Sequence, residues 1–163
     1  MTSVNPRAAL ARRCLATLLL AASTLAAGQD GPQPRLQTIS LTAGMHVIKA
    51  ELAVSPSQQA TGMMFRREMP GNEGMLFVND DTATRCFWMR NTLVPLTIAF
   101  VADDGTIVNL ADMKPFDEAS HCSTKPVRLV LEMNQGWFAK RGIRAGAKIS
   151  GPPFTAAATS PPR

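Results

Sequence analysis

Short apolar segments separated by turn-forming residues run through the chain from about residue 35 to residue 151. Several of them alternate apolar and polar residues, which is typical of strands with one buried face. Short strands bury their apolar side chains in sheets that curl or stack. The sequence therefore predicts a mainly β domain, a compact barrel-like or sandwich fold of about eight short strands. The expected strands are residues 36–41, 46–54, 75–78, 86–90, 96–101, 106–110, 127–133 and 148–150.

Turn and cap signals add a hairpin and one or two short helices to this pattern. Residues 103–105 read Asp-Asp-Gly, which predicts a tight hairpin because Asp-Gly tolerates positive φ angles. Residues 55–58 read Ser-Pro-Ser-Gln, a capping box that predicts a helix ending near Arg67. A second short helix is expected at residues 135–141, where Gly142 would stop it.

The first 26 residues have the layout of a secretory signal peptide. Arg7, Arg12 and Arg13 precede a short apolar run at residues 14–25, and small residues lie at the cleavage position. The run is too short to span a hydrocarbon layer of roughly 30 Å. We therefore expect cleavage after Ala26, export to the periplasm or beyond, and no stable membrane span in the mature chain. An uncleaved anchor is the alternative.

The mature chain is expected to hold one domain at residues 35–151, between a flexible leader at 27–34 and a disordered Pro/Ala-rich tail at 152–163. Cleavage removes three Lys or Arg residues and no acidic ones, so the net charge falls from +5 to +2. The basic cluster at residues 140–148 is not interleaved with aromatic side chains. We therefore expect a solvated face there, and no nucleic-acid partner.

Cys86 and Cys122 are the two cysteines of the mature chain. In an oxidising compartment two lone cysteines usually pair, and this bridge would contribute about 3–4 kcal/mol through loop closure. Metal binding and redox chemistry are the alternatives, although redox pairs usually lie closer together, as in C-x-x-C. We predict a structural disulfide that ties the strand at residues 86–90 to a long loop at residues 114–125.

No known catalytic motif is present, whether a nucleophile elbow, an HExxH helix, a P-loop or a paired CxxC. The mature chain has eight methionines, which could suit Cu(I), but they lack the repeated spacing of a copper site. We therefore predict no catalytic residue, metal or cofactor, and leave open whether the domain is an enzyme. Four glutamates could in principle supply a carboxylate pair for glycoside chemistry: Glu51, Glu68, Glu73 and Glu132.

Residues 86–92 place an aromatic ring among polar side chains. Trp88 is followed within four positions by Arg90, Asn91 and Thr92. A tryptophan with a few convergent polar groups is what a small-ligand pocket needs. The alternative is a core tryptophan beside a capped turn.

Three ordered motifs resemble the domain of unknown function 192 (DUF192) family. They are GMMFRREMPGNEGMLF at residues 62–77, FWMRNTLVPLTIAF at 87–100 and LEMNQGWFAKRGIRAG at 131–146. The resemblance extends over about residues 40–151 and implies a compact, mostly β, barrel-like fold. The activity of the family is not established, so the resemblance leaves the function open.

Carried over position by position, the resemblance marks fourteen residues, of which the apolar and glycine members suit core and backbone roles. Buried charges need partners, so we hypothesise that Arg66 pairs with Glu132 beside Trp88. The candidate binding residues are Arg66, Trp88, Asn91, Thr92 and Glu132. The full set is Gly62, Met64, Arg66, Gly74, Met75, Phe77, Trp88, Met89, Asn91, Thr92, Pro95, Leu96, Glu132 and Gly136.

The chain departs from the family pattern at Thr97. Relatives commonly carry an acidic residue after the Pro-Leu pair that here is Pro95-Leu96. If that acid were catalytic or a metal ligand in relatives, this chain would lack it.

Three functions remain open from the sequence. The first is an exported binding module for an unknown small molecule or envelope component. The second is a hydrolase of an envelope polymer or glycan, and the third is a structural or assembly factor of the cell envelope. We expect a monomer.

Overall fold

The computed structural model describes residues 31–154, which form nine strands, one α-helix and one short 3-10 helix. The chain order is β1 (Thr38–Ala43), β2 (His46–Ala53), α1 (Pro56–Thr61), β3 (Glu73–Ala83), β4 (Cys86–Phe87), β5 (Leu96–Val101), β6 (Ile107–Met113), β7 (His121–Cys122), β8 (Val127–Asn134), η1 (Ala139–Arg141) and β9 (Ile149–Ser150). The predicted mainly β class is confirmed. No helix among these residues is long and apolar enough to cross a membrane.

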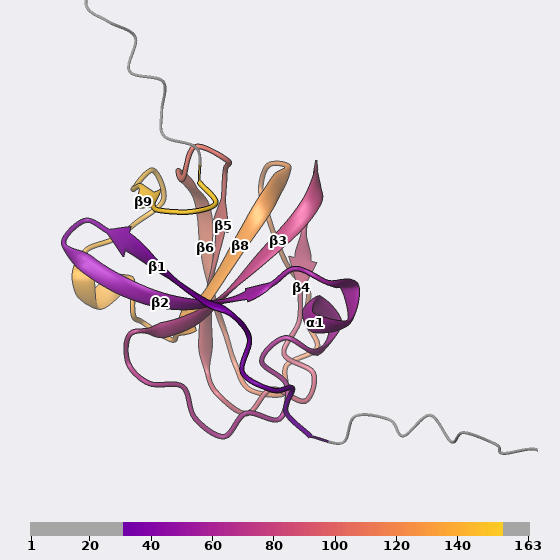
Figure 1. Ribbon diagram of the computed structural model, residues 1–163. Coiled ribbons are helices and arrows are strands. Elements are labelled where there is room, and N and C mark those ends of the chain that lie inside the picture. Colours follow the sequence, from indigo (N-terminus) through magenta and orange to yellow (C-terminus); the bar gives the residue numbers. More distant parts are fainter. Residues whose placement is uncertain (1–30, 155–163) are drawn as a thin grey trace, which may run out of the picture.

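Seven strands form one curled, half-barrel sheet in the order β6-β5-β8-β3-β2-β1-β9 (Figure 1). All neighbouring strands are antiparallel except β2 and β3, which α1 connects as a parallel pair. A bridge between Thr106 and Lys148 brings the ends of the two edge strands, β6 and β9, together. The remaining two strands, β4 and β7, form a separate ribbon.

Alternation along the central strand β8 divides the core between the two faces of the sheet. Leu129 and Leu131 enter one cluster, which we call the first core, together with Leu76 and Phe138. The residue between them, Val130, enters a second core on the other face. Its other large members are Met63, Met75, Phe77, Met89, Ile98 and Phe100.

The predicted hairpin and caps are confirmed. Residues 103–105 connect the antiparallel strands β5 and β6, and Gly105 has a φ of 82°. Ser55 and Gln58 form the reciprocal capping box at the start of α1. Gly142 ends η1 in the left-handed conformation, as its place in the sequence indicates.

Several element bounds differ from the prediction. The helix expected to reach Arg67 ends at Thr61, because Gly62 takes a φ of 48° and turns the following methionines inward. The strand expected at residues 75–78 runs on to Ala83, and the strand expected at 86–90 has only two residues. The long loop at 114–125 contains β7, which the sequence pattern does not indicate.

Ordered structure extends past the predicted domain at both ends. Gln33, expected in the flexible leader, is buried and donates hydrogen bonds to the carbonyls of Gln58 and Gly62. Phe154, expected in the disordered tail, packs against the first core. The predicted signal peptide, like residues 27–30 and 155–163, lies outside the described residues.

Candidate functional site

A hollow of about 370 Å³ lies between α1, the turn after it, and the segment at residues 85–92. Glu132 of β8 contributes the one carboxyl group of its wall, so we call it the Glu132 pocket. Its mouth carries Trp88, whose side chain is 46 % exposed. The remaining lining side chains include Gln59, Met63, Met64, Phe77, Asn79, Arg85, Phe87 and Thr92.

Glu132 is buried in apolar surroundings. Its register partners on the two flanking strands are Met75 and Ile98, both fully buried. The glutamate is only 4 % exposed, and no residue of the described part of the chain gives its carboxyl group a hydrogen bond or ion pair. Burial disfavours the charged form and raises the pKa of Glu132 from 4.5 to about 8. Glu132 is therefore protonated at neutral pH.

The expected pairing of Arg66 with Glu132 is wrong. Arg66 donates two hydrogen bonds, of 2.5 and 2.7 Å, to the carboxylate of Glu51 on β2. Arg35 and the backbone N–H of Leu36 also donate to this carboxylate. Burial would raise the pKa of Glu51, but these hydrogen bonds outweigh burial and lower the pKa to about 2. Arg66 therefore forms its ion pair with Glu51, and Glu132 has no arginine partner within residues 31–154.

The segment that carries Trp88 is held in place at several points. The predicted disulfide is present, and it joins Cys86 of β4 to the residue directly opposite, Cys122 of β7, with Cα atoms 4.0 Å apart. The backbone N–H of Met89 donates to the carbonyl of Asp117. Arg90 lies over the Trp88 ring, 5.7 Å from its centre. The mouth of the Glu132 pocket is therefore tied to the long loop.

Asn91 holds the turn after α1 through its backbone. Its carbonyl accepts a hydrogen bond from the N–H of Phe65, and both residues have positive φ angles, 54° and 62°. Asparagine tolerates this conformation, whereas a phenylalanine rarely adopts it. The contact orients the chain between Met64 and Arg66, so Asn91 shapes the site without lining it.

The five predicted site residues therefore separate into two groups. Trp88, Thr92 and Glu132 line one pocket, whereas Arg66 and Asn91 support the surrounding turns. Sequence reasoning missed the apolar wall, because the helix predicted to end near Arg67 would include Met63 and Met64. It also missed Arg85, which donates hydrogen bonds to the backbone of Val127 and to Asp81. The only sequence signal for the wall was its place in the first family motif.

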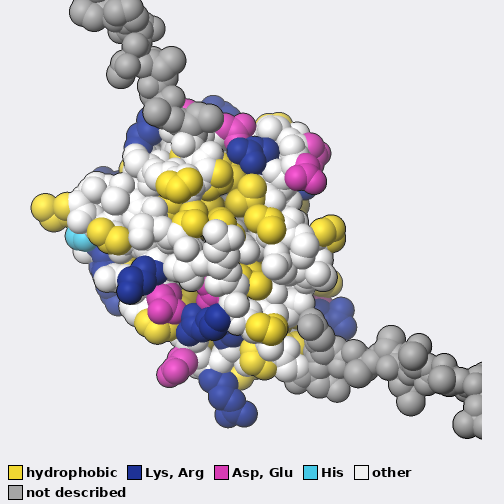
Figure 2. All heavy atoms as spheres, in the orientation of Figure 1, with side chains coloured by type: hydrophobic (Ala, Val, Ile, Leu, Met, Phe, Trp, Pro, Cys, Tyr) yellow, Lys and Arg dark blue, Asp and Glu magenta, His cyan; other side chains and the backbone are white. Residues whose placement is uncertain are grey.

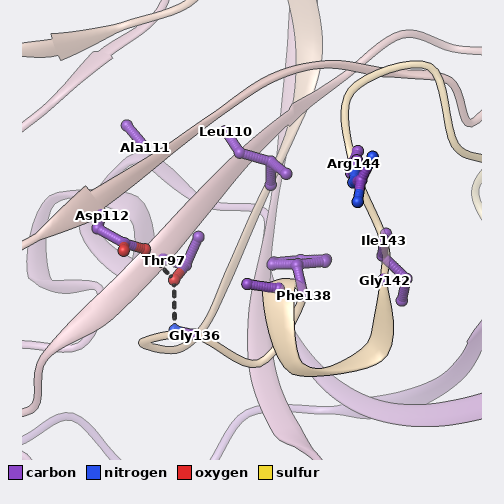
Figure 3. Close-up of a pocket in the computed structure, with 10 residues that line it drawn as sticks. Thr97, Leu110, Ala111, Asp112, Gly136, Phe138, Gly142, Ile143 and Arg144 are labelled. Atoms are coloured by element: carbon purple, nitrogen blue, oxygen red, sulfur yellow. Dashed lines mark hydrogen bonds between the residues drawn. The ribbon is translucent and has the colours of Figure 1, made fainter.

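A second hollow, of about 450 Å³, lies on the other face of the sheet, between β5, β6 and η1 (Figure 3). Thr97 accepts a hydrogen bond from the N–H of Gly136 and donates one to Asp112, its neighbour on β6. Leu110 and Phe138 form the apolar part of this wall. The polar groups beside Thr97 are thus hydrogen-bonded to one another. In this chain the side chain at position 97 accepts a hydrogen bond from a backbone N–H, and the threonine hydroxyl is sufficient for that role.

A third hollow, formed around Arg35, is the one described pocket with two carboxylates in its wall. Arg35 bonds to both of them, at 2.8 Å from Glu51 and 2.7 Å from Glu73. The hydrogen bonds from Arg66, Leu36 and Arg35 lower the pKa of Glu51 and hold its carboxyl group in the ionised form. Glu51 is therefore not the protonated acid that glycoside hydrolysis requires.

Comparisons with known proteins agree with the fold. The model of the DUF192 family, described as Uncharacterized ACR, matches residues 39–151. A Sinorhizobium meliloti structure described as a proposed transcription regulator has 36 % identity and a TM-score of 0.68, over 73 % of this chain and 97 % of its own. A Novosphingobium aromaticivorans protein of unknown function has 38 % identity and a TM-score of 0.69, over 77 % and 94 %. None of the curated proteins compared matches this chain.

Proposed function

The chain belongs to the DUF192 family, and we propose that it is an exported binding module that holds a small molecule in the Glu132 pocket. The observation that carries the proposal is the carboxyl group of Glu132, buried, without a partner and facing a hollow. Burial takes this carboxyl group out of bulk water, and no group in the part of the chain that the structure describes bonds to it. A ligand in the hollow that forms a hydrogen bond to Glu132 would therefore gain more than it would at an exposed carboxyl group.

The surroundings of Glu132 support a binding site more than a catalytic one. Most of the pocket wall is apolar, with a few polar groups, which is the usual composition of a small-ligand site. Among the described residues, this wall holds no second carboxylate and no histidine. A hydrolase of glycans needs an ionisable pair in one cleft, so this alternative has no support from the pocket.

Export is supported by the leader pattern at residues 1–26 and by the disulfide. Expressed in bacteria with its own leader, the protein is expected in the periplasmic fraction. Its intact mass should correspond to a chain that begins at Ala27 and carries one disulfide. A full-length chain recovered from the cytoplasm with free thiols would contradict this part of the proposal.

The Sinorhizobium meliloti relative is described as a transcription regulator, which raises the question of a nucleic-acid ligand. The basic cluster at residues 140–148 does not favour such a ligand. Lys148 pairs with Asp104, and Arg141 stacks on Trp137, 4.3 Å from the ring centre. Cations engaged within the protein are less available to phosphates. We therefore propose no nucleic-acid partner.

An assembly role is a second candidate, because hydrophobic side chains gather on one face of the molecule, between β9 and β3 (Figure 2). Half-buried side chains of three adjacent strands, Ile39, Leu52 and Val78, pack against the first core. An envelope protein that co-purifies with the wild type and with Glu132→Gln, but not with Val78→Lys, would favour this role instead.

The binding proposal can be tested by methyl NMR with a fragment library. The methyl groups of Met63 and Met64 report on the Glu132 pocket, and those of Met45 and Met133 serve as internal controls. Binders are expected to shift the first pair. Asp112→Asn, in the second hollow, should leave these shifts unchanged. The proposal fails if no fragment moves Met63 or Met64, or if binders shift residues of the second hollow instead.

A further inference from the structure

The wall of the Glu132 pocket offers a ligand more acceptors than donors. Gln59 uses both N–H groups of its amide on backbone carbonyls, those of Ala53 at 3.3 Å and Val78 at 2.8 Å. Asn79 donates to the carbonyl of Arg128 at 2.9 Å, and the hydroxyl of Thr92 donates to the carbonyl of Arg90 at 3.3 Å. These side chains therefore leave mainly oxygen atoms for a ligand, which favours a ligand that donates hydrogen bonds.

Arg85 is the other ionisable side chain of the pocket wall, and its charge is already compensated. Its guanidinium donates to the carboxylate and the carbonyl of Asp81, both at 2.6 Å, and to the carbonyl of Val127 at 3.4 Å. Glu51 and Arg66 lie beyond Met75 and neutralise each other. Among the ionisable groups of the pocket, Glu132 is thus the one whose charged form would have no oppositely charged partner in the described part of the protein.

The apolar wall suits a cation. Trp88, Phe77 and Phe87 contribute aromatic rings to the wall, and Met63 and Met64 add polarisable sulfur atoms. Aromatic rings attract positive charge, and Arg90 already lies over the Trp88 ring, 5.7 Å from its centre. An anion would meet an apolar wall and an acidic group, with Arg85 occupied by Asp81. The chemistry of the wall therefore discriminates against anions and in favour of organic cations.

We propose that the ligand is an organic ammonium ion, a primary or secondary amine with an apolar body, whose N–H groups bond to the carboxylate of Glu132. This inference rests on the proposed binding function and adds the class of ligand. When the amine enters, Glu132 transfers its proton to solvent, and the ammonium ion keeps its own. An ion pair then replaces the neutral acid, and one proton is released for each ligand bound at pH values below the pKa of Glu132.

Benzylamine and benzyl alcohol provide a matched pair of probes, of similar size and shape, that differ in charge. The Met63 and Met64 methyl shifts give the affinity of each probe for the wild-type protein. We expect benzylamine to bind about ninefold more tightly at pH 7 than at pH 6, and about fivefold more tightly again at pH 8, because the ionised fraction of Glu132 rises by these factors. Benzyl alcohol should show no such rise.

Glu132→Gln is the decisive variant, because glutamine keeps the size of the side chain and loses its charge. At pH 8 this variant should bind benzylamine about tenfold more weakly than the wild type, or weaker still, and it should bind benzyl alcohol with unchanged affinity. Calorimetry in two buffers of different ionisation enthalpy should detect about one proton released per amine at pH 6.5 in the wild type. Trp88→Leu should lower the affinity for benzylamine more than the affinity for benzyl alcohol.

Four results would overturn the inference, and each would leave a different conclusion. If the alcohol binds as well as the amine, with no proton release, the pocket binds neutral ligands and the binding function stands. If Glu132→Gln binds benzylamine like the wild type, the carboxylate is not the partner of the amine. If neither probe moves Met63 or Met64 while other fragments do, the ligand class is wrong; if no fragment does, the binding function fails as well.

Discussion

Two glutamates on one face of the sheet occupy opposite electrostatic environments. Glu51 on β2 and Glu132 on β8 are both register partners of Met75, which lies on the strand between them. Glu51 has an arginine in bonding distance and a pKa of about 2, and Glu132 has none and a pKa of about 8. The difference depends on where Arg66 enters the fold. A one-dimensional motif cannot specify this, so pairing Arg66 with Glu132 was reasonable and wrong.

Removing the acid at position 132 should stabilise the free protein at neutral pH. The folded state keeps the proton of Glu132 up to about pH 8, whereas the unfolded chain releases it near 4.5. This contribution to stability is therefore full below pH 4.5 and falls as the pH rises towards 8, by about 1.4 kcal/mol per pH unit. Glu132→Gln lacks this loss and should be about 3 kcal/mol more stable than the wild type at pH 7.

Urea unfolding at pH 5, 6, 7 and 8 measures this difference. Exposed Glu118→Gln is the control, and it should follow the wild type at every pH. A constant difference between Glu132→Gln and the wild type across this range would show that Glu132 titrates normally.

Arg66 should matter more for stability than Arg35, although both bond to Glu51. Arg66→Met leaves a buried carboxylate short of its main partner and should cost about 3 kcal/mol. Arg35→Met removes an arginine whose side chain is 59 % exposed, and it should cost less than about 1 kcal/mol. Glu51 contributes stability above pH 4.5 that is lost as the pH falls towards 2. Equal costs for the two variants, measured by urea unfolding, would contradict this ranking.

At the scale of elements, strands with strong alternation and good turn residues were predictable, and contacts between distant segments were not. The hairpin at residues 103–105 and the capping box at 55–58 are local, and both were found where expected. The ribbon of β4 and β7 has two residues per strand and no pattern of its own. Only its disulfide could be anticipated, from the cysteine count, so the position of Trp88 at a pocket mouth required the structure.

The ribbon should depend on its disulfide more than any other element. A double Cys86→Ser/Cys122→Ser variant loses the constraint on a 36-residue separation, and its free energy of unfolding should fall by about 3–4 kcal/mol. Benzylamine affinity should fall with it, because the segment carrying Trp88 loses its anchor. Unfolding and the Met64 methyl titration measure the two effects. Unchanged affinity would show that the other contacts of this segment suffice.

Thr97 supports the turn before η1, and this role is independent of the Glu132 pocket. Thr97→Val leaves the N–H of Gly136 without its acceptor and should cost about 1–3 kcal/mol. Thr97→Ser keeps the hydroxyl and should cost less. Neither variant should alter benzylamine binding, because residue 97 lies on the opposite face of the sheet from Glu132. A loss of binding without a loss of stability, in either variant, would contradict this assignment.

At the scale of the molecule, one curled sheet separates two sets of contacts. The first core, with η1 and the Thr97 hollow, lies on one face, and the second core, with the Glu132 pocket, on the other. Composition and patterning predicted the fold class because they average over many residues. The pocket depends on the curl of the sheet, which has no signal in the pattern, and on the end of α1 at Thr61, where Gly62 was a stop signal that the prediction did not use.

The central claim is that Glu132 is a buried acid without a partner, held ready for a ligand. A ¹³C NMR titration of its side-chain carboxyl carbon tests this claim most directly, in the free protein and with saturating benzylamine. We predict a titration midpoint near pH 8 in the free protein. With bound amine the midpoint should fall by about two pH units or more, which is a fall of about 100-fold in the proton affinity of Glu132. A free midpoint near 4.5, or one that bound benzylamine does not move, would contradict the account.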